Sequence, residues 1–313
     1  MTLVAVIGSL NADLTLLVGR LPGPGETALS SAPGTVGFGG KGGNQAAAAA
    51  AFGADVVMIG RVGDDDVGRL IRADLEKRGI DGSGVRVTPG ARSGGATIAV
   101  DPAGENLILV DPGANGQLSP GDIAPGLLDG AGAVLLQLEI PQPTVAAAVS
   151  MAAASTAAAR VVLNPAPAVP LGPGLLAGVD VLVPNRAELA LLAGSAPPSG
   201  LAATAELARR LPGDLDVVVT LGGDGALVVP RHGPAAHIAA PAVAAVDATG
   251  AGDCFCGTLA VSLAEGASLA DAARVSVAAA ALSVTAAGAR GLLPGRAEAV
   301  SLAASLTVTP AGG

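Results

Sequence analysis

Short apolar runs recur along the whole chain, and most of them are continuous rather than alternating with polar residues. Runs of this length, rich in Val, Ile and Leu, are typical of strands that are buried on both faces of a parallel sheet. They predict strands at residues 4–7, 56–59, 134–138, 161–163, 179–183, 217–221 and 226–229.

Segments with a helical period lie between many of these runs. The clearest begins near Asp64, and Gly79 is its expected C-terminal stop. Its apolar residues are predicted to share one face: Val67, Leu70, Ile71 and Leu75. Alternating strands and helices favour a parallel α/β sheet with crossover helices. Because half of the 313 residues are apolar and no linker or repeat divides them, we expect a single domain over 1–313.

Two regions interrupt this alternation. Residues from about 12 to 38 are rich in Pro, Gly and Thr and have no helical period. Residues 92–112 contain two short apolar runs, 97–100 and 107–110, separated by a turn sequence, which is the pattern of a β-hairpin. Together the two regions predict a small sheet that stands off the main one as a lid over a site.

Charge, hydropathy and cysteine content indicate which partners and which cellular location to expect. The net charge of −9 and the pI near 4.6 leave no basic stripe for a phosphate backbone, so nucleic acid is not an expected partner. The alanine-rich stretches 145–159 and 275–288 are too short and too weakly apolar to span ~30 Å of hydrocarbon, so no membrane association is expected. Cys254 and Cys256 fit neither a zinc quartet nor a disulfide framework, and no signal-like segment opens the chain, so we expect a cytoplasmic protein.

The strongest candidate for chemistry is Val246-Asp-Ala-Thr-Gly-Ala-Gly-Asp253, which precedes an apolar, helix-compatible run at 255–263. Gly250 and Gly252 allow successive amide N–H groups to converge at a helix N-terminus, which forms a cradle for phosphate. A carboxylate at Asp253 can accept the proton of a hydroxyl that attacks the phosphoryl group held there. The spacing fits equally well with Asp253 as a helix cap only.

A second glycine-rich segment, Phe38-Gly-Gly-Lys-Gly-Gly-Asn-Gln45, precedes an alanine-rich helix that ends near Gly53. Asn44 offers both a donor and an acceptor to a polyol, although a tight loop is an alternative explanation for the glycines. The segment is not a dinucleotide fingerprint, because no apolar strand leads into it, and it is not a Walker loop, because Gly42 follows Lys41.

Other polar residues follow predicted strands, at the edge where open α/β sheets bind ligands. They are Asn11, Asp13, Glu139, Asn185 and Glu188. Turns and helix caps are the ordinary alternatives for such residues. The segment Thr220-Leu-Gly-Gly-Asp-Gly225 is either a β-turn between two strands or a loop that contacts a nucleotide.

Taken together, Gly39-Gly-Lys-Gly-Gly-Asn-Gln45 and Asp247-Ala-Thr-Gly-Ala-Gly-Asp253 resemble the two signatures of the ribokinase (PfkB) family of carbohydrate kinases, in the same order. Further similarity extends from Gly8-Ser-Leu-Asn-Ala-Asp13 to Gly288-Ala289, which is nearly the whole chain. The resemblance implies a three-layer α/β/α sandwich with a mostly parallel central sheet and a small β-sheet lid. Because the motif forms are similar to those of ribokinases, it also implies ATP-dependent phosphorylation of D-ribose at the 5-hydroxyl.

The resemblance also implies roles for individual residues. The sugar hydroxyls would be bound by Asn11, Asp13, Gly40, Lys41, Asn44 and Glu139. Asp253 would be the base, and the developing charge would be held by Gly250, Ala251 and Gly252. ATP would be bound by Asn185, Thr220, Gly222, Gly225 and Gly252.

Metal ions and a dimer are implied in the same way. Glu188 would hold Mg²⁺ through water. A monovalent cation, usually K⁺, would lie at Asp247, Thr249, Val284, Ala287 and Ala289. The lid would also form the contact of a homodimer. The chain departs from the family pattern at Ala248, Cys256 and Leu292, and two of these departures, Ala248 and Leu292, adjoin the expected cation site.

Alternative functions remain open from the sequence. A kinase of the same family for deoxyribose, fructose or a nucleoside is the nearest, although a nucleoside pocket favours aromatic stacking and the chain has no Trp or Tyr and three Phe. The other alternative is a catalytically silent sugar-binding regulator on the same fold. Asp253 and the glycines beside it argue against that second alternative.

Overall fold

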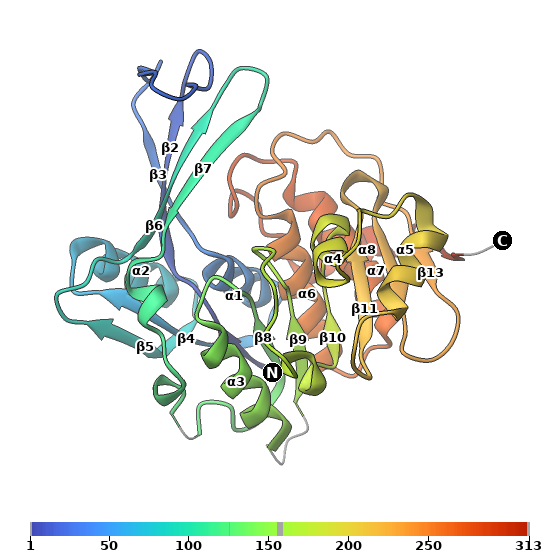
Figure 1. The fold of residues 1–313 in the computed structure, drawn as a ribbon. Coiled ribbons are helices and arrows are strands. Elements are labelled where there is room, and N and C mark those ends of the chain that lie inside the picture. Colours follow the sequence, from blue (N-terminus) through green and yellow to red (C-terminus); the bar gives the residue numbers. More distant parts are fainter. Residues whose placement is uncertain (1, 125, 155–158, 312–313) are drawn as a thin grey trace.

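A large twisted sheet forms the centre of the molecule, and helices cover both of its faces (Figure 1). The computed structural model describes residues 2–124, 126–154 and 159–311. Among these residues the sheet has ten strands in the order β14-β13-β12-β11-β10-β9-β8-β1-β4-β5. The parallel part contains β1 (Leu3–Ile7), β4 (Asp55–Gly63), β5 (Asp81–Thr88), β8 (Ala131–Leu136), β9 (Arg160–Leu163), β10 (Val181–Leu182) and β11 (Asp216–Thr220). The antiparallel edge contains β12 (Ala226–Val229), β13 (Ala236–Ile238) and β14 (Val308–Pro310).

Two apolar cores lie on opposite faces of this sheet. Along β1, Val4 and Val6 belong to one core, whereas Ala5 and Ile7 belong to the other, because successive side chains of a strand point to opposite faces. This double burial explains why the strand runs are continuously apolar. The predicted α/β/α fold class is confirmed, since each apolar run predicted as a strand overlaps a strand of the sheet.

The helices form one layer on each face. The first core is covered by α1 (Lys41–Ala51), α2 (Asp66–Lys77), α6 (Ala251–Ala264), α7 (Leu269–Ser283) and α8 (Arg296–Ala303). The second core is covered by α3 (Gln142–Ala154), α4 (Arg186–Leu192) and α5 (Gly200–Arg209). The alanine-rich stretch at 275–288 contributes to α7, and the one at 145–159 begins in α3 and extends beyond the described residues. None of the described helices combines the length and the apolar composition needed to cross a bilayer.

Helix α2 agrees with its prediction except at one residue. Asp65 caps it by accepting a hydrogen bond from the Gly68 N–H at 2.8 Å, and Gly79 follows its end with a positive φ of 72°. Ile71 and Leu75 are buried, but Leu70 is 57% exposed, so the prediction that it shares their face of the helix was wrong. At about 100° per residue, Leu70 lies about 140° from Leu75 around the helix, outside a narrow buried stripe.

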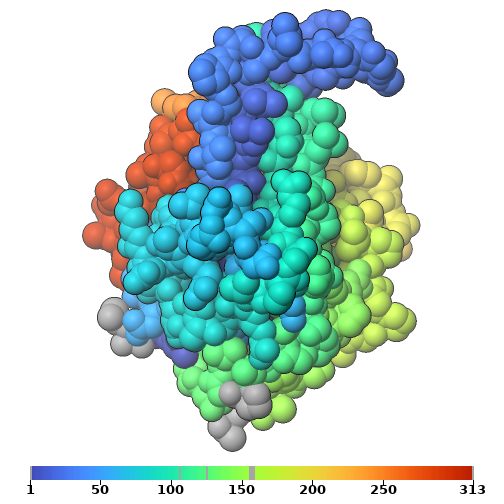
Figure 2. Space-filling view, turned by 90° about the vertical axis from the view of Figure 1, so that its left-hand side faces the viewer, coloured from blue at the N-terminus to red at the C-terminus, as the bar shows by residue number. Residues whose placement is uncertain are grey.

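A second, small sheet stands off the main one (Figure 1). It contains, in spatial order, β3 (Thr35–Gly39), β2 (Asn11–Leu17), β6 (Gly94–Val100) and β7 (Asn106–Asp111). The hairpin predicted from the apolar runs is present as β6 and β7, and its turn is held by the Asp101 carboxylate, which accepts from the Ala103 and Glu105 N–H groups at 2.9 and 3.0 Å. The space-filling view shows the N-terminal part of this sheet, in blue, extending over the top of the molecule (Figure 2).

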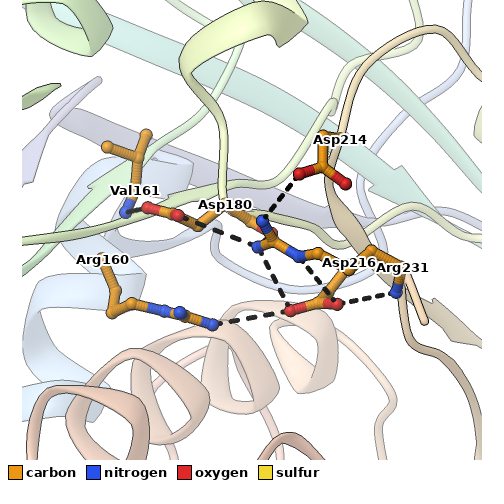
Figure 3. A network of polar contacts seen from close by, with 6 residues as sticks. All are labelled: Arg160, Val161, Asp180, Asp214, Asp216 and Arg231. Carbon is orange, nitrogen blue, oxygen red and sulfur yellow. Dashed lines mark hydrogen bonds and ion pairs between the residues drawn. The ribbon is translucent and has the colours of Figure 1, made fainter. Parts of the chain in front are cut away.

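A network of charged residues joins the strands at the edge where β9, β10 and β11 begin (Figure 3). Asp216 accepts from the Arg231 backbone N–H at 2.8 Å and lies 3.5 Å from the Arg160 guanidinium. Asp180 accepts from the Val161 N–H at 2.8 Å. Ligands of open α/β sheets bind at the opposite, carboxyl-terminal edge. We therefore interpret this network as a structural feature that fixes the register of these strands.

Candidate active site

The N-terminus of α6 begins with a glycine that no other residue replaces easily. Gly250 has a positive φ of 78°, and a Cβ there would lie 2.6 Å from the Ala289 carbonyl oxygen. The Ala251 N–H donates to the Ala248 carbonyl at 3.2 Å. Within the described chain, the next two amides, those of Gly252 and Asp253, have no backbone acceptor. The helix therefore presents free N–H groups and its positive dipole end, which is the arrangement that binds an anion.

The carboxylate of Asp253 joins this helix to the second glycine-rich segment. Its two oxygens each accept one hydrogen bond, from Asn44 Nδ2 and from Gln45 Nε2, both at 3.0 Å. Asn44 and Gln45 lie in the first turns of α1, so the two motifs meet although they are far apart in the chain. Each carboxylate oxygen keeps lone-pair capacity for a further donor such as a hydroxyl.

Gln45 is a site residue that sequence reasoning did not single out, although it closes the second motif. Its Oε1 accepts from Gln137 Nε2 at 2.7 Å, and its Nε2 also donates to Asn164 Oδ1 at 3.2 Å. Asn164 in turn donates to the Val183 carbonyl at 2.9 Å. These hydrogen bonds to residues that directly follow β8, β9 and β10 fix which atom of Gln45 faces Asp253.

Several charges surround Asp253. Burial raises the pKa of Asp253, and the Lys41 ammonium together with the Asn44 and Gln45 hydrogen bonds opposes that rise. Burial also works to lower the pKa of Lys41, but Asp253, Glu139 and Glu188 more than offset it and raise that pKa. Lys41 is thus a partly buried cation within electrostatic reach of three carboxylates, and Asp253 is a carboxylate with raised proton affinity, as a general base requires.

A cavity of about 340 Å³ lies between the main sheet and the small sheet, and Glu139 is the one of these charged residues that lines it. Its polar lining consists of Ser9, Asn11, Asn115 and Glu139. The volume is at the small end of the range that holds small organic ligands. Of the predicted sugar-binding residues, Asn11 and Glu139 line the cavity. Gly40 and Lys41 lie against its lining residues at the start of α1, and Asn44 follows one turn later in that helix.

Both lining residues are oriented by hydrogen bonds. Glu139 Oε2 accepts from the Ser9 hydroxyl at 2.6 Å and from the Lys41 N–H at 2.9 Å. Asn11 Oδ1 accepts from Asn115 Nδ2 at 2.8 Å, and Asn115 is itself held by the Leu10 N–H at 2.9 Å. The Nδ2 donor of Asn11 is therefore not used in its contact with Asn115. Asn115 is a further residue that sequence reasoning did not assign to the site.

Asp13 has an acceptor atom with no partner. Its Oδ1 is buried, and none of the residues that the structure describes donates a hydrogen bond to it. Burial, reinforced by the nearby charge of Glu139, raises the pKa of Asp13 to about 6, although Arg290 and the Ala96 N–H lower it. A buried carboxylate oxygen without a donor destabilises the free protein, and a ligand hydroxyl is the kind of group that would satisfy it.

Asn185 and Glu188 form a reciprocal cap on α4. The Asn185 side chain accepts from the Glu188 N–H and the Glu188 Oε2 accepts from the Asn185 N–H, both at 2.8 Å. The two residues thus form a capping box, which was the ordinary alternative expected from the sequence. Glu188 also takes part in the electrostatics of the site. Burial and the charge of Asp253 raise the pKa of Glu188, while Lys41 lowers it. Glu188 therefore lies within electrostatic reach of Asp253, with its Oε1 free of the cap.

The residues predicted to contact a nucleotide lie next to this cap. Thr220, the last residue of β11, donates its N–H to the Pro184 carbonyl at 2.9 Å and pairs with Asn185. Gly222 and Gly225 are joined by a backbone hydrogen bond of 3.0 Å in a turn between β11 and β12, as the alternative reading expected. The structure brings Thr220 and Asn185 together, and it records no direct contact of Gly222 or Gly225 with Asp253.

The predicted cation loop is closed by Asp247. Its Oδ1 accepts from the Thr249 N–H and its Oδ2 from the Gly288 N–H, both at 2.8 Å. The Val284 carbonyl accepts from the N–H groups of Val246 and Asp247, at 2.7 and 3.1 Å. Both lone pairs of that carbonyl are used within the protein, which counts against Val284 as a ligand.

Other atoms of the loop fit a monovalent cation better. In the described chain the carbonyls of Ala287 and Ala289 accept no backbone hydrogen bond. The described residues contain no group of three or more His, Cys, Asp or Glu side chains suited to a metal ion. One carboxylate and several carbonyls form a donor set with low charge, which suits K⁺ better than a transition metal.

The sequence pattern of the pfkB family of carbohydrate kinases matches residues 1–296. The chain belongs to this family. Ribokinase of Haemophilus influenzae is 36% identical over 298 residues, which cover 94% of this PfkB kinase and 96% of that protein. Deoxyribokinase of Salmonella typhimurium is 37% identical over 296 residues, 93% of this kinase and 95% of that protein. The solved structure of Arabidopsis thaliana ribokinase with ribose and ATP is similar to this kinase with a TM-score of 0.87 and 31% identity, covering 96% of this chain and 98% of that one.

Membership of the family makes this chain a carbohydrate kinase and confirms the expected fold, a mostly parallel sheet between helices with a small additional sheet. In this PfkB kinase the two signature segments are the ones whose side chains meet at Asp253.

Proposed function

We propose that this PfkB kinase transfers the γ-phosphoryl group of ATP to the 5-hydroxyl of D-ribose, giving D-ribose 5-phosphate and ADP. The observation that carries the proposal is the Asp253 carboxylate, which lies at a helix N-terminus with free amides and is held by Asn44 and Gln45. The similarity to ribokinases over nearly the whole chain, one of them solved with ribose and ATP, supports ribose and ATP as the substrates.

In the proposed reaction, different residues act as the base, hold the phosphoryl group and bind the sugar. Asp253 accepts the proton of the 5-hydroxyl as that oxygen attacks phosphorus. The anion hole is placed at Gly250, Ala251 and Gly252. Of these, Gly252 offers an N–H without a backbone acceptor in the described chain, whereas the Ala251 N–H already donates to the Ala248 carbonyl at 3.2 Å. The sugar hydroxyls are held by Asn11, Asp13, Gly40, Lys41, Asn44 and Glu139. The unpartnered Asp13 Oδ1 supports this assignment, because a sugar hydroxyl would supply the missing donor.

We propose that ATP lies along Asn185, Thr220, Gly222, Gly225 and Gly252. Glu188 would hold Mg²⁺ through water with its free Oε1, and Mg²⁺ bound there neutralises charge on the transferring phosphates. A monovalent cation such as K⁺ would be held by Asp247 and by the carbonyls of Thr249, Ala287 and Ala289, where it would stabilise the loop behind Gly250.

We also propose that residues 1–313 act as one domain whose small sheet is a lid, formed by segments 12–38 and 92–112. Val110 of β7 lines the cavity, so this sheet is placed to close over a sugar. A cytoplasmic location is proposed because Cys254 and Cys256 are both buried free thiols, which suits a reducing compartment.

The lid is also proposed to form a homodimer. Its surface carries exposed apolar side chains, among them Val36, Ile108 and Leu109 at 72%, 52% and 63% exposure. Ile108→Asp is expected to convert a dimer to a monomer in sedimentation velocity, because a charge would be buried in the interface. The matched control is Leu70→Asp, since Leu70 is 57% exposed but lies on α2. A protein whose Ile108→Asp variant keeps the wild-type mass does not dimerise through the lid.

The substrate is tested by a coupled assay of ADP formation with ribose, 2-deoxyribose, fructose and adenosine, each with and without K⁺. We expect the highest kcat/KM for ribose and a higher rate with K⁺. A kcat/KM for 2-deoxyribose that equals or exceeds that for ribose would favour the alternative of a deoxyribokinase, which the 37% identity to the Salmonella protein raises. Binding of ribose without phosphorylation of any acceptor would indicate a silent regulator instead.

A further inference from the structure

Arg290 is a buried cation in the active site that has no part in the proposed chemistry. It follows Ala289 in the loop after α7, and its side chain is 8% exposed. Burial lowers the pKa of Arg290 to about 10, so the side chain remains charged at neutral pH. Burying a charge costs free energy unless the charge is paired and hydrogen-bonded. The partners of the Arg290 guanidinium therefore indicate its role.

The guanidinium joins three elements. Its Nε donates to Asn44 Oδ1 on α1 at 2.8 Å, its Nη1 donates to Asp74 Oδ2 on α2 at 2.8 Å, and its Nη2 donates to the Gly39 carbonyl at the end of β3 at 3.1 Å. The geometry points to Arg290 as a positioning residue that fixes the orientation of the Asn44 amide and, through it, the Asp253 carboxylate. This inference rests on the proposed function, because it names what holds the base and the sugar-binding amide in place.

The donors and acceptors of the Asn44 amide determine how it can lie between Arg290 and Asp253. Arg290 can only donate, and the ionised Asp253 carboxylate can only accept. Asn44 lies between them, and its Oδ1 faces Arg290 while its Nδ2 faces Asp253. A flipped amide would place its NH₂ against the guanidinium and its oxygen against the carboxylate, and both contacts would be repulsive. Arg290 therefore leaves Asn44 a single favourable orientation.

Gly43 shows that the surroundings accommodate this arginine. A Cβ on Gly43 would lie 2.5 Å from Arg290 Nη2 and 3.1 Å from Leu10 Cδ2. The guanidinium is tied by three hydrogen bonds, so it cannot move aside without breaking them. Gly43 thus provides the space that Arg290 occupies, and we expect substitution of either residue to disturb the same contact.

Three carboxylates lie near Arg290: those of Asp13, Asp74 and Asp253. Arg290 lies close enough to Asp13 to lower the pKa of that carboxyl, and Asp253 and Asp13 act in turn on the pKa of Arg290. Asp74 has a second partner in Arg78, whose Nε donates to the same oxygen at 2.9 Å. Replacing Arg290 therefore does not leave Asp74 without a counter-ion.

The test is a double-mutant cycle in the full-length protein with Arg290→Gln and Asn44→Ala, assayed with ribose and ATP. We expect Arg290→Gln alone to lower kcat/KM for ribose by about tenfold or more, the effect of losing a charged hydrogen bond, with the KM for ATP nearly unchanged. In the Asn44→Ala background the same substitution should change kcat/KM by less than about twofold, because the atom it acts on is gone. Gly43→Ala should reproduce the loss, and Arg78→Gln, which touches Asp74 but not Asn44, should keep the wild-type value.

The outcomes separate the inference from the proposed function. If the wild-type protein phosphorylates no ribose, the proposed function fails and the inference fails with it. If the wild type is active but Arg290→Gln costs the same factor with and without Asn44, Arg290 acts independently of Asn44 and the inference alone is wrong. If Arg290→Gln does not fold, the cycle is run with Gly43→Ala in its place, and additive losses there overturn the inference equally.

Discussion

Replacing Asp253 with Asn is expected to lower kcat by about a thousandfold, within the range that a general base contributes. The amide cannot take the proton of the attacking hydroxyl, whereas it still occupies the same space beside Asn44 and Gln45. We expect the Kd for ribose, measured by calorimetry without ATP, to change by less than about tenfold, because most sugar contacts are untouched. The two measurements together distinguish loss of a base from loss of binding.

A matched control tests the alternative that Asp253 only caps a helix. Asp271 is also an acidic residue in a first turn, on α7, where it accepts from Ser268 and Arg274 and is exposed. Asp271→Asn should leave kcat at the wild-type value. If Asp253→Asn also retains near-normal turnover, then Asp253 is a helix cap and the proposed chemistry is wrong.

Asp13→Asn is expected to weaken ribose binding by about tenfold or more and at the same time to stabilise the free protein at pH 8. The folded protein raises the pKa of Asp13 from 3.8 to about 6, so its ionisation disfavours folding. The stability linked to the protonated form is fully present below about 3.8 and is lost as the pH rises through about 6. Because Asp13 is partly open to solvent, we expect a gain of about 1–2 kcal/mol for the variant at pH 8, and none near pH 4.

Urea unfolding at the two pH values measures the gain, and calorimetry with ribose measures the loss of affinity. The wild-type affinity for ribose should also fall as the pH drops below about 6, because a protonated Asp13 accepts sugar hydroxyls less well, and the variant should lack this dependence. A variant that binds ribose normally, or that is destabilised at pH 8, would show that the unpaired Asp13 Oδ1 is not kept for the sugar.

The fold could be predicted where burial determines the sequence directly. Strands buried on both faces must be continuously apolar, so runs such as 134–138 and 217–221 identified β8 and β11. Strand β5 was missed because Asp81–Thr88 alternates glycine, polar and apolar residues at the edge of the sheet. Leu70 was misplaced because a repeating apolar pattern does not tell how wide the buried face of a helix is.

The site could be predicted only as far as local motifs reached. Asn44 and Asp253 each lie in a glycine-rich segment whose backbone already indicates a ligand. Gln137 and Arg290 lie in ordinary sequence, and their roles depend on side chains that meet only after the chain has folded. Asn185 shows a different limit, because the same residue can cap a helix and line a site, and spacing does not separate the two.

The most direct test of the account is a crystal structure of the full-length protein with ribose and a non-hydrolysable ATP analogue. We expect one oxygen of Asp253 within about 2.6–3.2 Å of the ribose 5-hydroxyl, and the terminal phosphate at the free amides that begin α6. A sugar bound elsewhere, with Asp253 contacting only Asn44 and Gln45, would contradict the account.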